Sequence, residues 1–281
     1  MNTFALLQEQ LIAALEKVDS ITFIHDVWTK ENGHGQSSIL ESGTVIERGA
    51  VLRSEIRGSS LPPVASASRP HLSGLPYEVR GVSVVIHPQN PFAPTAHINI
   101  RQFKTETSSW VGGGMDLTPH YLFIEDAILF HQAARDISPS LYPTWKKQCD
   151  DYFWLKHRSE ARGIGGVFFD DYTAPDGLEV LQRLVHGFMA AYSKILQRRK
   201  DTLFTEQHRA WQLLRRGRYA EFNLVWDRGT AFGLQSGGRI ESILASMPPL
   251  AAWQYAVSPL PDSPEAALLE VLRSPKDWLK T

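Results

Sequence analysis

The chain is poor in several features that would assign it to large classes of protein. It has 281 residues but a single cysteine, Cys149. One thiol excludes, within one chain, a disulfide framework, a four-thiolate zinc site and a cysteine-ligated iron–sulfur cluster. The formal net charge is only −1, so the charge balance predicts no nucleic acid or acidic membrane as a partner. No apolar run approaches the roughly 18 residues that a membrane-spanning helix needs.

The composition that remains is that of an ordinary globular protein. Hydrophobic residues make up 43% and charged residues 21% of the chain, and the length allows a large core. Apolar residues recur at helical spacing over residues 3–18, with Glu9 and Glu16 between them. This pattern is typical of an amphipathic helix and not of a signal peptide. We therefore expect a cytoplasmic protein that forms a single domain over residues 1–281.

The segment Thr95–Phe103 alternates strictly between polar and apolar residues. His97, Asn99 and Arg101 share one face and two isoleucines share the other, which is the period of a β-strand. The polar face combines an imidazole, an amide and a guanidinium within about 13 Å, at roughly 3.3 Å per residue. Either this face lines a functional site or the segment is a half-exposed edge strand.

A second strand is predicted over Gly81–His87, where Ser83 and His87 share one face. Only a proline-containing turn separates this strand from Thr95–Phe103. We therefore expect an antiparallel pair whose polar side chains approach one surface.

The other expected elements follow from periodicity and from turn residues. Strands are expected over 21–28, 45–56, 105–111, 163–171 and 219–227. Helices are expected over 120–136, 142–161, 178–196, 205–216 and 264–272. Turns or loops are expected over 32–36, 59–76, 112–119 and 236–241. This succession of elements predicts an α+β fold.

Four histidines near the expected strands and turns are candidate metal ligands: His87, His97, His131 and His157. Neutral imidazole binds Zn, Mn, Fe or Cu. No pair has the His-x-x-x-His spacing of one helix face, and packed or hydrogen-bonded histidine is the alternative for each residue.

Four arginines adjoin glycine-rich or mixed polar and apolar motifs: Arg101, Arg158, Arg162 and Arg239. A guanidinium binds a carboxylate through two parallel hydrogen bonds, so several arginines in one pocket indicate a polycarboxylate or polyphosphate ligand. The alternative is ion pairing within the protein, for which the candidate partners are Asp150, Asp170 and Asp171.

Two glycine-rich runs accompany these residues. Asp116 follows three glycines and is either a turn or cap aspartate or a catalytic carboxylate. The spacing of a dinucleotide or Walker loop is missing from this run. Gly237 and Gly238 precede Arg239, where free backbone N–H groups suit a carboxylate or phosphate. From the residues alone we infer an α+β enzyme with a His/Arg/Asp site for an anionic ligand.

Taken together, the motifs closely resemble those of oxygen-dependent coproporphyrinogen III oxidase. One of them is Trp110-Val-Gly-Gly-Gly-Met-Asp-Leu-Thr-Pro119. The others lie at 81–87, 97–101, 142–152, 157–158, 162–172, 215–230 and 233–249. The resemblance extends over about residues 43–275.

The resemblance implies a flat antiparallel sheet with helices on both sides, in a homodimer whose contact falls at about 219–256. It implies an enzyme of haem biosynthesis that converts coproporphyrinogen III to protoporphyrinogen IX. Two propionates become vinyls, O2 is consumed, and CO2 and H2O2 are released. Flavin, haem and iron–sulfur clusters are not needed, whereas Mn or another divalent cation has been claimed for some members.

The resemblance also assigns roles to individual residues. His97 matches the proton donor, and Asp116 matches the aspartate that holds the pyrrole N–H groups. The metal ligands would be His87, His97, His131 and His157. The substrate-binding positions would be Ser83, Asn99, Ile100, Arg101, Gly237, Gly238 and Arg239, with Arg158 and Arg162 for the remaining carboxylates.

Two other classes of function remain open. One is a metal-dependent oxygenase or hydrolase that uses the four histidines on another polycarboxylate, and the other is a non-catalytic tetrapyrrole-binding module.

Overall fold

A seven-stranded antiparallel sheet organises the structure. The computed structural model describes residues 2–61, 69–235 and 238–280. Neighbouring strands follow the order β1-β2-β3-β4-β5-β6-β9, and every pair is antiparallel. The strands are β1 (Ile24–Lys30), β2 (Gly33–Glu41), β3 (Ile46–Gly58), β4 (Tyr77–Pro88), β5 (Thr95–Thr105), β6 (Ser109–Thr118) and β9 (Gly165–Tyr172). The first six strands form a meander, and β9 forms the edge beyond β6.

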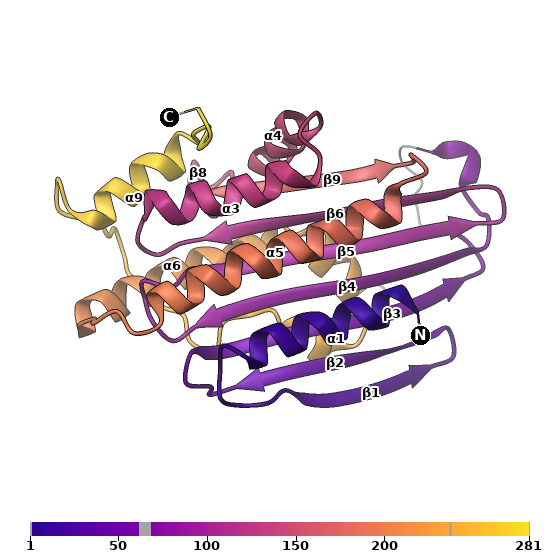
Figure 1. The fold of residues 1–281 in the computed structure, drawn as a ribbon, viewed down its shortest axis with the longest axis horizontal. Helices are drawn as coiled ribbons and strands as arrows, with labels where there is room; N and C mark the ends of the chain where they lie inside the picture. The colour runs from indigo at the N-terminus through magenta and orange to yellow at the C-terminus, as the bar shows by residue number, and fades with distance from the viewer. Residues whose placement is uncertain (1, 62–68, 236–237, 281) are drawn as a thin grey trace.

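One face of the sheet is apolar and carries the main core. Alternate residues of the central strands, such as Val84, Ile98 and Ile100, are at most 1% exposed. Three helices lie over this face: α1 (Thr3–Glu16), α3 (Ile124–Ile137) and α5 (Gly177–Arg199) (Figure 1). Helix α5 packs directly on β6, because a Cβ atom added at Gly113 would lie 3.1 Å from the Leu184 side chain.

The opposite face of the sheet is covered by α6 (Glu206–Val225), which runs behind the strands in Figure 1. Tyr219 of α6 meets the ring of His87 in β4 at 5.0 Å between centroids. The buried Arg216 donates to Glu47 of β3 at 2.6 Å and to the Pro88 carbonyl at 2.8 Å. Helix α7 (Arg228–Gln235) and helix α8 (Ile240–Leu244) follow α6. The expected α+β fold, an antiparallel sheet with helices on both sides, is confirmed.

Smaller elements complete the edge beside β9. Helix α4 (Tyr142–Tyr152) packs along β9, where Trp145 stacks on Phe169 at 4.2 Å. The short strands β7 (Trp154–Leu155) and β8 (Glu160–Ala161) pair with each other, and α9 (Pro264–Arg273) lies beside β8. The 3-10 turn η1 (Pro70–Leu72) precedes β4. No helix in the described part of the chain is long and apolar enough to cross a membrane.

Two expectations for the second half of the chain were wrong. The segment 219–227 is not a strand, since α6 continues to Val225, with the buried Tyr219 and Asn223 one helical turn apart. Aromatic and branched residues suggested a strand, but the buried positions follow helical spacing. The helix expected over 142–161 ends at Tyr152. The β7–β8 hairpin therefore carries His157 and Arg158 instead of a helix face.

Two expected turns are also strands. Residues 33–36 belong to β2, and Gly112–Thr118 belong to β6. Glycine is rare in strands, but it is used where another backbone comes close. A Cβ atom added at Gly114 would lie 2.6 Å from the carbonyl oxygen of Val167 in β9. The strand expected over 105–111 begins only at Ser109.

Candidate active site

The register of β4, β5 and β6 gathers most of the polar side chains singled out in the sequence. Ser83 pairs with Asn99, His97 pairs with Asp116, and Asn99 also pairs with Gly114. Directly paired residues point to the same side of a sheet. We call this side, defined by Ser83, His97, Asn99, Arg101 and Asp116, the polar face. It is the face covered by α6.

Ile100 does not share this orientation. Its side chain is 1% exposed and belongs to the main core on the opposite face. Only its backbone is therefore available to a ligand on the polar face.

Small residues separate the polar groups on this face. Gly112 pairs with Arg101, and Gly81 pairs with Arg101 from the other side. A Cβ atom added at Gly81 would approach only the Ile100 carbonyl oxygen at 3.2 Å and the Arg101 Cβ atom at 3.8 Å. The two positions that pair with Arg101 therefore carry no side chain.

A buried ion pair lies at the centre of the polar face. Asp116 accepts hydrogen bonds from Nδ1 of His97 at 2.8 Å and from a terminal guanidinium nitrogen of Arg162 at 2.6 Å. Arg162 also donates to the side-chain oxygen of Asn223 in α6 at 2.9 Å. The rings of Phe153, Tyr219 and Phe222 surround the guanidinium at 4.1–4.8 Å. Asp116 and Arg162 are both 3% exposed, whereas the His97 side chain is 19% exposed.

The electrostatics of this pair fix the protonation of its members. Burial opposes ionisation of Asp116, but Arg162 and the hydrogen bond from His97 outweigh burial and hold the pKa of Asp116 below its usual value. Asp116 is therefore a carboxylate at neutral pH and can only accept hydrogen bonds. Nδ1 of His97 must carry the proton that it donates, so Nε2 is the basic nitrogen of the neutral ring.

Two of the expected substrate-binding arginines are held by carboxylates of the protein. Arg101 donates to Asn99 at 2.7 Å and forms an ion pair with Asp170 of β9. Arg239 forms an ion pair with Asp26 of β1 and precedes α8 as its N-cap residue. Nearby, the hydroxyl groups of Ser242 and Ser37 lie 2.8 Å apart.

Of the two glycines before Arg239, the structure describes only Gly238. Gly237 lies outside the described residues. Gly238 donates its backbone N–H to the Gly233 carbonyl at 2.8 Å.

Arg158 and Arg162 are also engaged within the protein. Arg158 binds both carboxylate oxygens of Glu221, at 2.8 and 2.9 Å. Glu221 further accepts hydrogen bonds from His157, Arg218 and Trp253. Burial opposes ionisation of Glu221, but these donors outweigh it and lower its pKa to about 2.

The four candidate metal ligands do not come together. Both nitrogens of His87 are hydrogen-bonded, to the Thr95 hydroxyl at 3.1 Å and to the Ser246 carbonyl at 2.9 Å. Both nitrogens of His131, in α3, bond to the Tyr142 hydroxyl and the Ile164 carbonyl, each at 2.9 Å. A carbonyl accepts only from a protonated ring nitrogen, so these imidazoles offer no free lone pair at Nε2.

Burial lowers the pKa of His87 to about 3 and that of His131 to about 4. Among the described residues, no group of three or more His, Cys, Asp or Glu side chains is placed to hold a metal ion. The expected four-histidine metal site therefore does not fit this structure.

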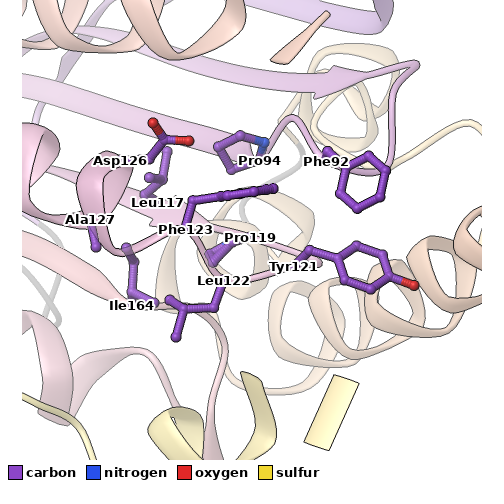
Figure 2. Close-up of a pocket in the computed structure, with 10 residues that line it drawn as sticks. All are labelled: Phe92, Pro94, Leu117, Pro119, Tyr121, Leu122, Phe123, Asp126, Ala127 and Ile164. Atoms are coloured by element: carbon purple, nitrogen blue, oxygen red, sulfur yellow. The ribbon is translucent and has the colours of Figure 1, made fainter. Parts of the chain in front are cut away.

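Two hollows in the structure lie away from the polar face. Figure 2 shows the first, which has room for about one water molecule. It is lined by Phe92, Pro94, Leu117, Pro119, Tyr121, Leu122, Phe123, Asp126, Ala127 and Ile164. The second, of about 260 Å³, lies between α6 and residues 257–265. Neither hollow is lined by a residue of the polar face.

Several functional candidates were missed in the sequence. Asn223 lay within an expected strand, and its helical spacing from Tyr219 was the signal that could have placed it in α6. Phe168 and Arg228 gave no separate signal, although they contact Arg101 and Asp170 respectively.

Comparison with protein families agrees with this arrangement. The model of the family described as coproporphyrinogen III oxidase matches residues 1–278 of the 281-residue chain. The match includes every strand of the sheet and every residue of the polar face. The chain therefore belongs to the coproporphyrinogen III oxidase family, whose reaction is the oxidative decarboxylation of coproporphyrinogen III in haem biosynthesis.

Proposed function

We propose that the protein is the oxygen-dependent form of the enzyme, with O2 as the electron acceptor. The observation that carries this proposal is the single cysteine. An oxygen-independent route through a cysteine-bound iron–sulfur cluster needs several thiolates. Cys149 is fully buried, and burial raises the pKa of its thiol well above the usual value. It therefore supplies neither the number nor the form of ligand that a cluster requires.

Each turnover balances as one two-electron oxidation. A propionate side chain loses CO2 and one hydrogen from its β-carbon and becomes a vinyl group. O2 takes up two electrons and two protons and becomes H2O2. One of these protons comes from the β-carbon and the other from solvent or an acidic group of the enzyme. Two such turnovers convert coproporphyrinogen III to protoporphyrinogen IX.

The polar face offers matching groups for the substrate. Coproporphyrinogen III carries four carboxylates, and the proposed contacts of Arg101 and Arg239 bind two of them. Ser83 and Asn99 add neutral hydrogen-bonding groups beside Arg101, and the small residues of the sheet leave space next to them. Each charged hydrogen bond contributes about 1.5–3 kcal/mol, with less at partly exposed sites.

We assign proton transfer to His97 and an orienting role to Asp116. Asp116 is buried and binds His97 and Arg162, whereas the ring of His97 is the least buried of the three groups. The carboxylate fixes the tautomer with Nδ1 protonated and stabilises the imidazolium that forms when Nε2 accepts a proton. The direct contact between Asp116 and the pyrrole N–H groups, which the resemblance implied, is replaced in this proposal by contact through His97.

We further propose that the enzyme acts as a homodimer in the cytoplasm. Large apolar side chains are 54–98% exposed near the expected contact at 219–256: Leu224, Val225, Leu250, Trp253, Tyr255 and Leu260. Monomeric proteins rarely expose so many large apolar groups on one stretch of chain. Light scattering should give twice the monomer mass, and Leu250→Glu should lower it. A wild-type monomer at micromolar concentration would contradict the dimer.

The oxygen dependence is tested by assaying coproporphyrinogen III in air and under strict anaerobiosis. Products are oxidised to fluorescent porphyrins and separated. The amounts of H2O2 and CO2 that are released are measured and compared. The proposal expects equal amounts of H2O2 and CO2 in air and no product without O2. Anaerobic turnover would exclude it. Loss of activity after prolonged dialysis against a chelator, restored only by a metal, would favour a metal-dependent oxygenase instead.

A further inference from the structure

We infer that Asp170 is a specificity-determining residue, whose carboxylate occupies the position that a substrate carboxylate takes between Arg101 and Arg228. The inference rests on the proposed function, because it assumes that the polar face binds a polycarboxylate. It adds an internal competitor to that site.

The geometry places one carboxylate between two guanidinium groups. The pairing of Phe168 with Gly114 puts the Phe168 side chain on the polar face. Asp170 lies just beyond, where the register of β9 against β6 shifts, and its ion pair with Arg101 places its carboxylate on the same face. One oxygen of Asp170 binds Arg101. The other lies 3.4 Å from a terminal nitrogen of Arg228, the first residue of α7. The two arginines therefore share a single counterion.

Both arginines are also held by groups other than Asp170. Arg101 donates to Asn99 at 2.7 Å and lies 5.7 Å from the ring of Phe168. Arg228 lies 4.8 Å from the ring of Tyr152, which stacks on Phe168 at 4.4 Å. If the carboxylate of Asp170 moves away, the two guanidinium groups stay in place on this aromatic pair.

The sheet carries no side chain beneath this ion pair. Gly112 lies beneath the Arg101–Asp170 pair, and an added Cβ atom would lie 2.8 Å from the Asp170 oxygen and 3.0 Å from two nitrogens of Arg101. The side chains of Arg101, Asp170 and Arg228 are 24%, 36% and 59% exposed. Solvent and ligands can therefore reach all three.

The consequence for specificity follows from effective concentration. Asp170 is tethered beside the two arginines, so a free monocarboxylate must compete with a local concentration in the millimolar range or above. A tetracarboxylate that is already bound by Arg239 and by other groups of the polar face brings its next carboxylate at a comparable local concentration. Asp170 thus disfavours simple anions more than it disfavours the substrate.

The test measures binding of coproporphyrin III, a stable tetracarboxylate, by quenching of its fluorescence, together with displacement by free propionate. Asp170→Asn should bind coproporphyrin III about five- to tenfold more tightly, and the inhibition constant of propionate, calculated from the displacement curve and the affinity of each variant for coproporphyrin III, should fall by a larger factor. Asp171→Asn is the matched control, because it removes the same charge one residue along, where Arg69 is the partner. Asparagine also accepts the positive φ of 61° at that position. The control should match wild type.

A second variant keeps the test informative. Arg228→Gln, at an exposed position, should bind coproporphyrin III about fivefold more weakly. Equal or weaker binding by Asp170→Asn, or unchanged binding by Arg228→Gln, would overturn the inference while leaving the proposed reaction intact. If the three proteins show the expected order of affinities for coproporphyrin III but wild type never turns over coproporphyrinogen III, the proposed function is overturned instead.

Discussion

Arg162 is the residue at which the structure departs most from its expected role in substrate binding. Replacing it by methionine removes the guanidinium between Asp116 and Asn223 and leaves the Asp116 carboxylate buried without its cation. Breaking a buried ion pair on one side costs about 3–5 kcal/mol. The lost contacts with Phe153, Tyr219 and Phe222 act in the same direction.

The expected loss is large enough to measure directly. For a chain of this length the entropy of unfolding is about 0.6 kcal/mol/K near 60 °C, so Arg162→Met should lower Tm by about 5–8 °C. Urea unfolding followed by tryptophan fluorescence gives the free energy independently, since the chain has eight tryptophans. In steady-state kinetics kcat should fall, because Asp116 loses the cation that favours its ionised form and is a weaker acceptor for the N–H of His97. KM should change little.

The double variant Arg162→Met with Asp116→Asn separates the ion pair from other effects. Removing both charges leaves no buried ion, so its stability should recover to within about 2 kcal/mol of wild type. Its kcat should stay low. A loss below about 1 kcal/mol in Arg162→Met, or an effect confined to KM, would refute this reasoning and return Arg162 to substrate binding.

Three further predictions concern single residues. His97→Ala should lower kcat by about 10²–10⁴-fold with a smaller effect on substrate affinity; a loss confined to KM would contradict the proton-transfer role. Arg101→Ala should raise KM about tenfold at nearly constant kcat, because it removes a partly exposed charged contact; an unchanged KM would contradict carboxylate binding there. His131 is neutral in the folded state, with its pKa lowered by burial to about 4, against about 6.5 when unfolded. Its contribution to the free energy of unfolding is therefore complete above pH 6.5 and is lost as the pH falls towards 4. The loss between pH 7 and pH 5 is about 2 kcal/mol. Urea unfolding at both pH values should show this component missing in His131→Gln, and an unchanged pH dependence would refute the assignment.

Local patterns predicted β5 and its polar face because alternation along one strand is encoded within nine residues. The side of the sheet that His97 and Arg101 occupy was therefore predictable. The glycine-rich strand β6 was not predictable. Its Gly114 is required by the close approach of the Val167 carbonyl oxygen, which belongs to a neighbouring strand far along the chain. The extent of α6 also depended on tertiary packing, since its aromatic residues are buried against the sheet.

The partners of the charged residues could not be predicted from the sequence. Asp170 was considered as an ion-pair partner, but nothing local distinguishes its contact with Arg101 from one with Arg158. The histidines show the same limit, because only the folded chain reveals that the nitrogens of His87 and His131 are used by hydroxyl and carbonyl groups.

The contacts that join α8 to the first two strands have a consequence for how the protein is made. Arg239 and Asp26 are separated by 213 positions, and Ser37 and Ser242 by 205. The ribosome synthesises about 5–20 residues per second, so the partners of Asp26 and Ser37 are made roughly 10–40 s after strands β1 and β2. During that time the strands can pair as a meander, but the cover of the polar face has not been synthesised. Folding of this region is therefore late and non-local, and a chain that stops before Arg239 leaves Asp26 and Ser37 without these two contacts.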